Sequence, residues 1–332
     1  MFSQLNELGQ QRIPFFFVIN FACNNFYLQP LAELSNEVFF DFDGFQHLEA
    51  THDPSTIVIQ QPIIEQPIDL KSYHSAFQHT QNYMRDGHTY LLNLTFPTKI
   101  MLQNSLLEIF TASQAKFKLY FKNQFVVFSP ERFVRVTHNV IKTYPMKGTI
   151  NAMLPDAAQK ILANTKEMAE HTMVVDLLRN DLSRIATKVR VEKFRYLDKI
   201  QAGNKMLLQV SSEISGQLEN HWQNRLGNIL AQLLPAGSIS GTPKKRTLEI
   251  IQQVEDYDRG FFTGIFGYFD GENLDSAVLI RFIEQQDNQF FYKSGGGLTI
   301  DSNLCEEYQE MLAKIYIPIG FSKKDAKTLR ND

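Results

Sequence analysis

Strand-like and helix-like segments are grouped along this chain, and this grouping limits the folds open to it. A parallel doubly wound sheet needs strands and helices that alternate, whereas grouped segments favour antiparallel sheets. The pattern therefore predicts an α+β fold. The strand-like segments have alternating apolar residues or tight Asn-containing turns, and they cover residues 89–100, 118–129, 133–146, 263–271, 275–285 and 289–300. The helical patterns cover residues 154–163, 165–185, 243–254 and 304–316.

The opening of the chain is also rich in strand patterns. Short apolar runs at 13–21, 37–42 and 56–60 predict buried strands, residues 60–70 read as a connection, and 72–87 as a helix that ends at Gly87. We therefore expect an N-terminal β-rich segment over 1–70 packed on a main domain over 71–320, followed by a tail over 321–332.

Charge and cysteine content exclude several classes of protein. The net charge is −3 and the basic residues are scattered, so we expect no nucleic-acid partner. The two cysteines, Cys23 and Cys305, form no disulfide framework or CxxC motif, which fits a reducing cytoplasm. The first residues lack a basic n-region, and their apolar run is too short to span a bilayer. We expect a cytoplasmic protein without a membrane partner.

Two acids lie on the apolar face of the predicted helix 165–185. Helical spacing places Glu167 and Glu170 on the same stripe as Val174. A carboxylate on a buried face needs a cation or a proton. Salt bridges to Arg179 or Arg184 would satisfy that need, and so would a metal ion.

The last predicted helix repeats the arrangement. Glu307 and Glu310 are three residues apart, with Lys314 one turn further on. Four acids in two pairs suggest one metal ion, and oxygen-only ligands favour Mg²⁺. The second pair lies at the edge of its apolar stripe, so a solvated surface pair stays open as the alternative.

Two glycine-containing motifs could receive an anion. Residues 235–245 do not have P-loop spacing, but Thr242 as N-cap and Pro243 at the first helical position would leave free N–H groups at a helix start. The triple glycine within 294–302 could form an amide nest. An ordinary capped helix and a flexible hairpin loop are the alternatives. Arg281, in a strand-like segment, suits a carboxylate.

Taken together, these motifs resemble the chorismate-utilising enzymes. The matching segments occur in the family order over roughly residues 73–316, and most closely resemble the aminodeoxychorismate synthases. The resemblance implies two large antiparallel sheets in an anthranilate synthase-like, two-lobed sandwich, with helices outside and a chorismate-binding catalytic domain over 71–320. It rests on SPERF (129–133), YPMKGT (144–149), KEMAEHTMVVDLLRNDLSRI (166–185), PAGSISGTPKKRTLEII (235–251), TGIFGYFDGENLDSAVLIR (263–281), GGGLTIDS (295–302) and EEYQEMLAK (306–314).

The resemblance also implies a chemistry. Lys147 would attack C2 of chorismate while Glu131 protonates the departing C4 hydroxyl, and ammonia would then enter at C4. The amine must be uncharged to attack, and Glu131 needs a raised pKa to hold a proton at neutral pH. The alternative to a catalytic role is that Lys147 is an ordinary solvent-exposed lysine in a turn.

Further roles follow from the same resemblance. Mg²⁺ would be held by Glu170 and Glu310 with help from Glu167 and Glu307, and it would take the ring carboxylate of chorismate. The implied substrate contacts are Gly148 and Thr149 along the ring, Gly295, Gly296 and Gly297 with Lys314 at the ring carboxylate, and Tyr268 with Arg281 at the enolpyruvyl carboxylate.

Three departures from the family pattern refine the expectation. Leu91 stands where relatives have Gln, or a Lys in isochorismate and salicylate synthases, which disfavours isochorismate synthesis. Gln209 stands where many members have His, which disfavours pyruvate elimination. Because the N-terminal part is short, we expect the tryptophan pocket of longer relatives to be incomplete.

The nitrogen source is expected to lie on another protein. Neither cysteine has the sequence context of a glutamine amidotransferase, so a glutaminase subunit would supply ammonia. Anthranilate synthase component I and a non-catalytic chorismate-binding subunit are the alternative functions.

Overall fold

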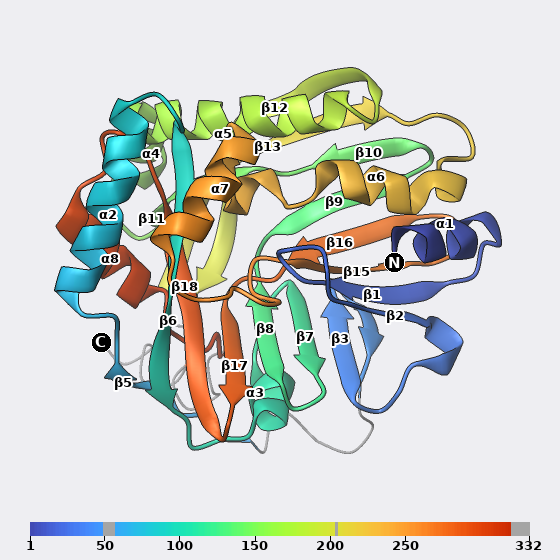
Figure 1. The fold of residues 1–332 in the computed structure, drawn as a ribbon, viewed down its shortest axis with the longest axis horizontal. Coiled ribbons are helices and arrows are strands. Elements are labelled where there is room, and N and C mark those ends of the chain that lie inside the picture. The colour runs from blue at the N-terminus through green and yellow to red at the C-terminus, as the bar shows by residue number, and fades with distance from the viewer. Residues whose placement is uncertain (49–56, 203–204, 320–332) are drawn as a thin grey trace.

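The computed structural model describes residues 1–48, 57–202 and 205–319, and in that part the strands form two large antiparallel sheets. The strands of the two sheets run in clearly different directions in Figure 1. This arrangement confirms the predicted fold class. The first sheet has the order β11 (Met146–Asn151), β13 (Lys205–Gln217), β10 (Val140–Thr143), β9 (Arg132–Thr137), β16 (Leu274–Val278), β15 (Ile265–Phe269), β1 (Phe15–Ile19) and β2 (Phe26–Pro30), with β12 (Thr187–Ala202) also beside β13.

The second sheet is similar in size to the first. It contains strands from both the N-terminal and the C-terminal parts of the chain. Its order is β14 (Gly241–Thr242), β6 (Leu91–Met101), β18 (Gln289–Leu298), β17 (Phe282–Gln286), β8 (Phe125–Ser129), β7 (Phe117–Phe121), β3 (Val38–Phe42) and β4 (Phe45–His47), with β5 (Ile63–Gln66) beside β6. The N-terminal strands thus extend both sheets, while the boundary at residue 70 stays a prediction.

Helices lie around the sheets (Figure 1). They are α1 (Phe2–Gln10), α2 (Leu70–Arg85), α3 (Leu106–Ala112), α4 (Ala157–Ala163), α5 (Thr165–Ser183), α6 (Leu226–Leu233), α7 (Lys244–Val254) and α8 (Leu304–Ala313). One apolar cluster joins α5 and α6 to the first sheet, and another joins α2, α7 and α8 to the second.

Phenylalanines form the layer between the sheets. Phe16 of β1 stacks on Phe40 of β3, with ring centroids 4.6 Å apart, and Phe42 packs against Phe266. Alternate residues of β1 belong to different clusters, because Phe15 and Phe17 face the helices while Phe16 faces the second sheet. A strand buried on both faces explains the continuous apolar run in its sequence.

Two of the places where the chain crosses between the sheets lie next to each other. Glu131 lies between β8 and β9, and Arg281 lies between β16 and β17. The Val278 amide donates to the Glu131 carbonyl at 3.1 Å, and the Phe128 amide donates to the Arg281 carbonyl at 3.1 Å. These backbone bonds hold the two crossings side by side. Arg281 was expected inside a strand, and its φ of +56° shows why it is not.

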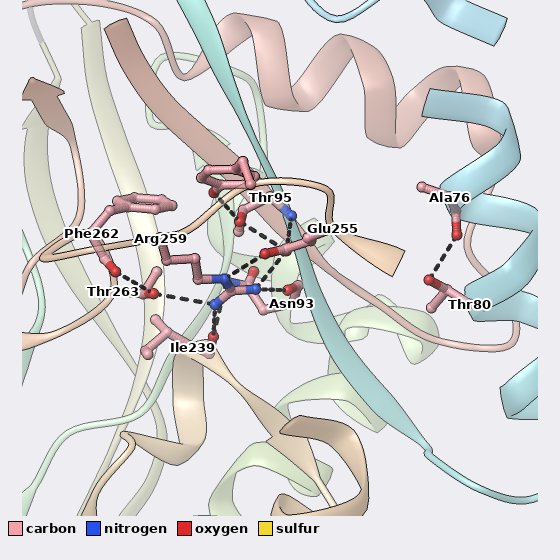
Figure 2. Close-up of polar contacts among 10 residues, drawn as sticks. Ala76, Thr80, Asn93, Thr95, Ile239, Glu255, Arg259, Phe262 and Thr263 are labelled. Atoms are coloured by element: carbon pink, nitrogen blue, oxygen red, sulfur yellow. Dashed lines mark hydrogen bonds and ion pairs between the residues drawn. The ribbon is translucent and has the colours of Figure 1, made fainter. Parts of the chain in front are cut away.

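A buried ion pair joins the second sheet to the loops beside it (Figure 2). The guanidinium of Arg259 binds both carboxylate oxygens of Glu255, at 2.7 and 2.8 Å. Its other N–H groups donate to the carbonyls of Ile239 and Asn93 and to the hydroxyl of Thr263. All five donors of this arginine are therefore used, which a buried guanidinium requires.

Several local predictions were wrong. Residues 57–60 are not a strand, and residue 56 lies outside the described residues. The edge strand β5 instead forms inside the predicted connection, because Ile63 and Ile64 pair with the end of β6. Helix α7 begins at Lys244 with Pro243, not Thr242, at the N-cap position. The glycines of 295–297 belong to β18 rather than to a hairpin loop. The expected tail over 321–332 lies outside the described residues.

Removal of the buried guanidinium should destabilise the fold. Arg259→Met leaves the Glu255 carboxylate buried without its cation, so the free energy of unfolding should fall by about 3–5 kcal/mol in urea titrations. The control is Arg225→Met, which breaks an exposed pair with Glu219 and should cost no more than about 1 kcal/mol. Equal effects of the two substitutions would contradict this prediction.

Candidate active site

A cavity of about 240 Å³ lies beside the two crossings. It is large enough for a small organic molecule and is lined by both acidic and basic side chains. Ten residues that the sequence indicated line it, namely Glu131, Lys147, Gly148, Thr149, Arg281, Gly295, Gly296, Gly297, Glu310 and Lys314. The structure thus brings together most of the candidate site.

An irregularity in β11 places Lys147. The pairing of β11 with β13 shifts register between Met146 and Thr149, and Gly148 has a φ of +78°. A bulge of this kind re-aims the side chains next to it. The Lys147 ammonium nitrogen lies 2.8 Å from the point that a Cβ on Gly297 would occupy. Lys147 therefore lines the cavity and reaches the second sheet, in contrast to a solvated turn lysine.

Glu131 faces the same cavity from the first crossing. Burial raises the pKa of its carboxyl group, while the hydroxyl of Ser238, which donates to Oε1, and the charge of Lys147 act in the opposite direction. The net direction is upward, as expected for an acid that must hold its proton.

The three glycines give the cavity an open strand edge. Gly295, Gly296 and Gly297 pair with β6 on one side. On the other side β17 pairs with β18 only as far as Lys293 in the described part of the chain. Backbone groups of this segment are therefore accessible from the cavity. Leu91 is buried beside this segment, with its Cδ1 atom 3.3 Å from the Cβ position of Gly297, but it does not line the cavity.

The acids of α5 approach this site from the side of Lys147. An oxygen of Glu167 lies 2.7 Å from the Cβ position of Gly148, and the φ of +78° at this residue favours glycine. Burial raises the pKa of Glu170; Lys147 opposes that shift and Glu167 adds to it. Arg179 forms its ion pair with Asp176 rather than with either of these acids.

The acids of α8 lie in different surroundings. Glu307 is buried, and burial raises its pKa although Ser302 donates to it. A purely solvated pair is therefore wrong for this residue. Desolvation acts to raise the pKa of Glu310, but the ammonium of Lys314 at 2.8 Å and the charges of Lys147 and Lys166 together lower it.

The protein side chains alone supply only part of the ligands that a magnesium ion needs. In the residues that the structure describes, no group of three or more His, Cys, Asp or Glu side chains stands close enough to hold a metal. The pKa of Glu170 is raised mainly by burial, and the charges of Glu167 and Glu307 add to the shift, which a cation would relieve. Mg²⁺ commonly takes one or two carboxylates and completes its shell with water and substrate oxygens. Such a site suits these residues.

Arg281 and Lys314 are linked at the far side of the cavity. The Arg281 side chain donates to the Lys314 carbonyl at 3.0 Å, and the Lys314 ammonium donates to the Gly295 carbonyl at 2.7 Å. Tyr268, in contrast, does not line the cavity. Its ring stacks on Phe45 with centroids 4.1 Å apart, because β15 turns that residue toward β4. We therefore correct the proposed pairing of Tyr268 with Arg281, and Phe262 lines the cavity instead.

Sequence reasoning missed other members of the wall. Asn93, Ser238 and Phe262 all line the cavity. Ser238 lies in a glycine-rich motif that had been considered only as a helix start, and Asn93 lies in an ordinary strand pattern. A second cavity of about 500 Å³ adjoins the first, and the two share Gln209 and Arg281 among their lining residues.

Comparison with known proteins decides the family. The model of the chorismate binding enzyme family matches residues 22–320. This chain belongs to that family. An uncharacterized PabA-like protein of Haemophilus influenzae is 49% identical over 318 residues, with 96% of each chain covered. Aminodeoxychorismate synthase component 1 of Escherichia coli is 30% identical over 262 residues, which cover 74% of this chain and 56% of that protein.

Solved structures of family members share the fold. The menaquinone-specific isochorismate synthase of Escherichia coli matches with a TM-score of 0.73 at 15% identity, covering 94% of this chain and 79% of that one. Anthranilate synthase component I of Streptococcus pneumoniae matches with a TM-score of 0.65 at 24% identity, covering 77% and 59%. In the described residues no helix is both long and apolar enough to span a membrane.

The electrostatics of Glu170 predict a pH-dependent stability. Because its pKa is raised above the ordinary value of 4.5, the folded state keeps a proton that the unfolded state loses, and stability falls as pH rises through that window. Glu170→Gln removes this loss. We expect the variant to be more stable than the wild type in urea titrations at pH 8, with the difference shrinking toward pH 4. The control is Glu7→Gln, at an exposed position of α1, which should not change the dependence of stability on pH.

Proposed function

We propose that this protein is an aminodeoxychorismate synthase component I, which converts chorismate and ammonia to 4-amino-4-deoxychorismate for p-aminobenzoate and folate synthesis. The observation that carries the proposal is the position of Lys147 and Glu131 in one cavity, where an amine and an acid of raised pKa face each other. A nucleophile and an acid are the two groups that substitution of a ring hydroxyl needs.

The reaction proceeds by two substitutions. The amine nitrogen of Lys147 bonds to C2 of the ring, the ring double bond shifts, and the C4 hydroxyl leaves as water with the proton of Glu131. Ammonia then bonds to C4, and Lys147 departs from C2 with its bonding electrons. Glu131 regains a proton from the new ammonium group. One ammonia enters and one water leaves, with C4 geometry retained.

The remaining residues bind the two carboxylates of the substrate. The open edge at Gly295, Gly296 and Gly297 offers backbone N–H groups to the ring carboxylate. Arg281, at the boundary of the two cavities, suits the enolpyruvyl carboxylate because its planar fork can bind both oxygens. Thr149 and Gly148 lie along the ring between these ends.

Two residues disfavour the reactions of related enzymes. Leu91, whose Cδ1 atom lies 3.3 Å from the Cβ position of Gly297, stands where isochorismate and salicylate synthases have the Lys that activates water. Gln209 supplies an amide where relatives that eliminate pyruvate have a histidine, and an amide cannot take a proton as a base. Anthranilate synthesis is therefore the weaker alternative.

Mg²⁺ is the proposed cofactor. Glu170 and Glu310 would hold it, with Glu167 and Glu307 acting directly or through water. When bound, the ion would supply positive charge for the ring carboxylate. Lys314 already neutralises Glu310, so the acids of α5 and Glu307 carry the charge that the ion would balance.

Ammonia is proposed to come from a separate glutamine amidotransferase. Cys305 is exposed on α8 and Cys23 lies in a turn, and neither belongs to the cavity described above. The protein should also use free ammonium at alkaline pH, where more of it is present as NH₃.

Mass spectrometry of the product tests the proposal. With chorismate, Mg²⁺ and high ammonium at alkaline pH, the wild type should form 4-amino-4-deoxychorismate. Lys147→Ala should lower that rate by at least about a thousandfold, because the covalent route is lost. The control is Lys160→Ala on the exposed face of α4. Anthranilate or isochorismate as the only product would refute the proposal, as would unimpaired amination by Lys147→Ala. Chorismate binding without any product would favour a non-catalytic subunit.

Magnesium binding has its own test. Mg²⁺ in the presence of chorismate should raise the thermal midpoint at pH 8, and the effect should weaken on acidification because protons compete for the raised-pKa acids Glu170 and Glu307. Glu170→Gln should weaken the apparent Mg²⁺ affinity by about tenfold or more. Glu7→Gln serves as the matched control. A wild-type magnesium response in Glu170→Gln would remove this residue from the metal site.

A further inference from the structure

The segment 236–240 is held against the active-site cavity by hydrogen bonds and packing. It contains a short 3-10 helix over Gly237–Ile239, and the Ser240 hydroxyl closes the turn by donating to the Ala236 carbonyl at 2.9 Å. The Ile239 carbonyl accepts two hydrogen bonds, from Arg259 at 3.1 Å and from Asn93 at 3.1 Å. One end of the segment is thus attached to the buried ion pair shown in Figure 2.

The other side of the segment rests on α5. A Cβ added to Gly237 would lie 2.9 Å from an oxygen of Asp181 and 3.1 Å from Leu177, so the backbone is in direct contact with that helix. Asp181 is itself paired with Lys244 at 2.7 Å, and Lys244 also donates to the Leu233 carbonyl. Because both ends are fixed, the side chain between them has a defined position.

That side chain is Ser238. It lines the cavity, and its hydroxyl donates to Oε1 of Glu131. The backbone of Glu131 is fixed as well, since its amide donates to Ser129 and its carbonyl accepts from Val278. The proposed reaction steps make no use of Ser238, although its hydroxyl is hydrogen-bonded to the carboxyl group of Glu131.

We infer that Ser238 is a positioning residue for the catalytic acid. A carboxyl group whose Oε1 accepts a hydrogen bond carries its proton on Oε2. The serine thus selects the oxygen from which Glu131 delivers its proton and prevents rotation of the carboxyl group. A proton held at one defined atom is what general acid catalysis requires. This inference rests on the proposed role of Glu131.

The hydroxyl also favours the ionised form of Glu131, and so does the charge of Lys147 on β11. Arg281, Lys293, Glu310 and Lys314 are the other charged side chains of the same cavity. Removal of the hydroxyl should therefore raise the pKa of Glu131 further. Since the protonated acid is the active form, the alkaline limb of the kcat profile should move to higher pH, while the proton loses its fixed position.

The experiment compares Ser238→Ala with Ser238→Thr, which keeps the hydroxyl. We expect Ser238→Ala to move the alkaline limb of kcat upward by about one to two pH units and to lower kcat at its optimum by about tenfold. Ser238→Thr should restore both. Ser183→Ala, on the exposed side of α5, is the matched control and should leave both unchanged.

A second readout does not depend on activity. The carboxyl band of Glu131, identified by its absence in Glu131→Gln, is titrated by infrared spectroscopy in the wild type and in Ser238→Ala. A higher midpoint in Ser238→Ala supports the inference; equal midpoints and equal pH profiles overturn it. If the wild type makes no aminodeoxychorismate, the proposed function fails, and the infrared titration still decides whether Ser238 holds the acid.

Discussion

The buried pair of Arg259 and Glu255 is the interaction on which the site depends. Its guanidinium holds the carbonyls of Asn93 and Ile239, and both of these residues line the cavity. A buried charge pair contributes little net stability compared with apolar packing, but once formed it tolerates no change of partner. Burial of both charges makes the pair energetically costly, and because neither charge can exchange its partner, the pair also fixes the distance between the second sheet and the segment that carries Ser238. Rigidity of the cavity wall follows from complete use of the arginine donors.

Most charged side chains of the cavity have a polar partner or a proposed role in the reaction. Lys314 is occupied by Glu310 and by the Gly295 carbonyl, and Arg281 is tied to the backbone of residue 314. The charge of Lys147 acts to lower the pKa of two acids, Glu131 and Glu170. An anionic substrate would therefore meet paired cations at its carboxylate ends and an amine near its ring. The raised pKa values of Glu131 and Glu170 have a common cause in burial, but only Glu131 has a hydroxyl that directs its proton.

Sequence patterns predicted the sheets and most of the cavity for a definite physical reason. Apolar periodicity reports burial, and burial of both faces of β1 and of one face of α5 was visible in the residues themselves. Residues 187–217 carried no such clear signal, although β12 and β13 there complete the first sheet, because β12 is a largely exposed strand rich in charged residues. The placement of Tyr268 at the enolpyruvyl carboxylate came from the family resemblance, which did not indicate that its ring stacks on Phe45. Ser238 could not be linked to Glu131 either, because the residues are 107 positions apart and meet only through the loop contacts around Ile239.

The same fold supports different reactions, so the chemistry must lie in a few side chains of the wall. An isochorismate synthase aligns over 94% of this chain at 15% identity, and most side chains therefore differ while the sheets superpose. In this chain the crossings between sheets, the bulge at Gly148 and the open strand edge at the glycines shape the cavity. Under the proposed function they would determine where a ring and its carboxylates lie. What reacts with the ring is then decided by the groups that point at it. Under the proposed function, the amide of Gln209 and the amine of Lys147 in this cavity, with Leu91 beside Gly297, would favour attack by nitrogen over attack by water.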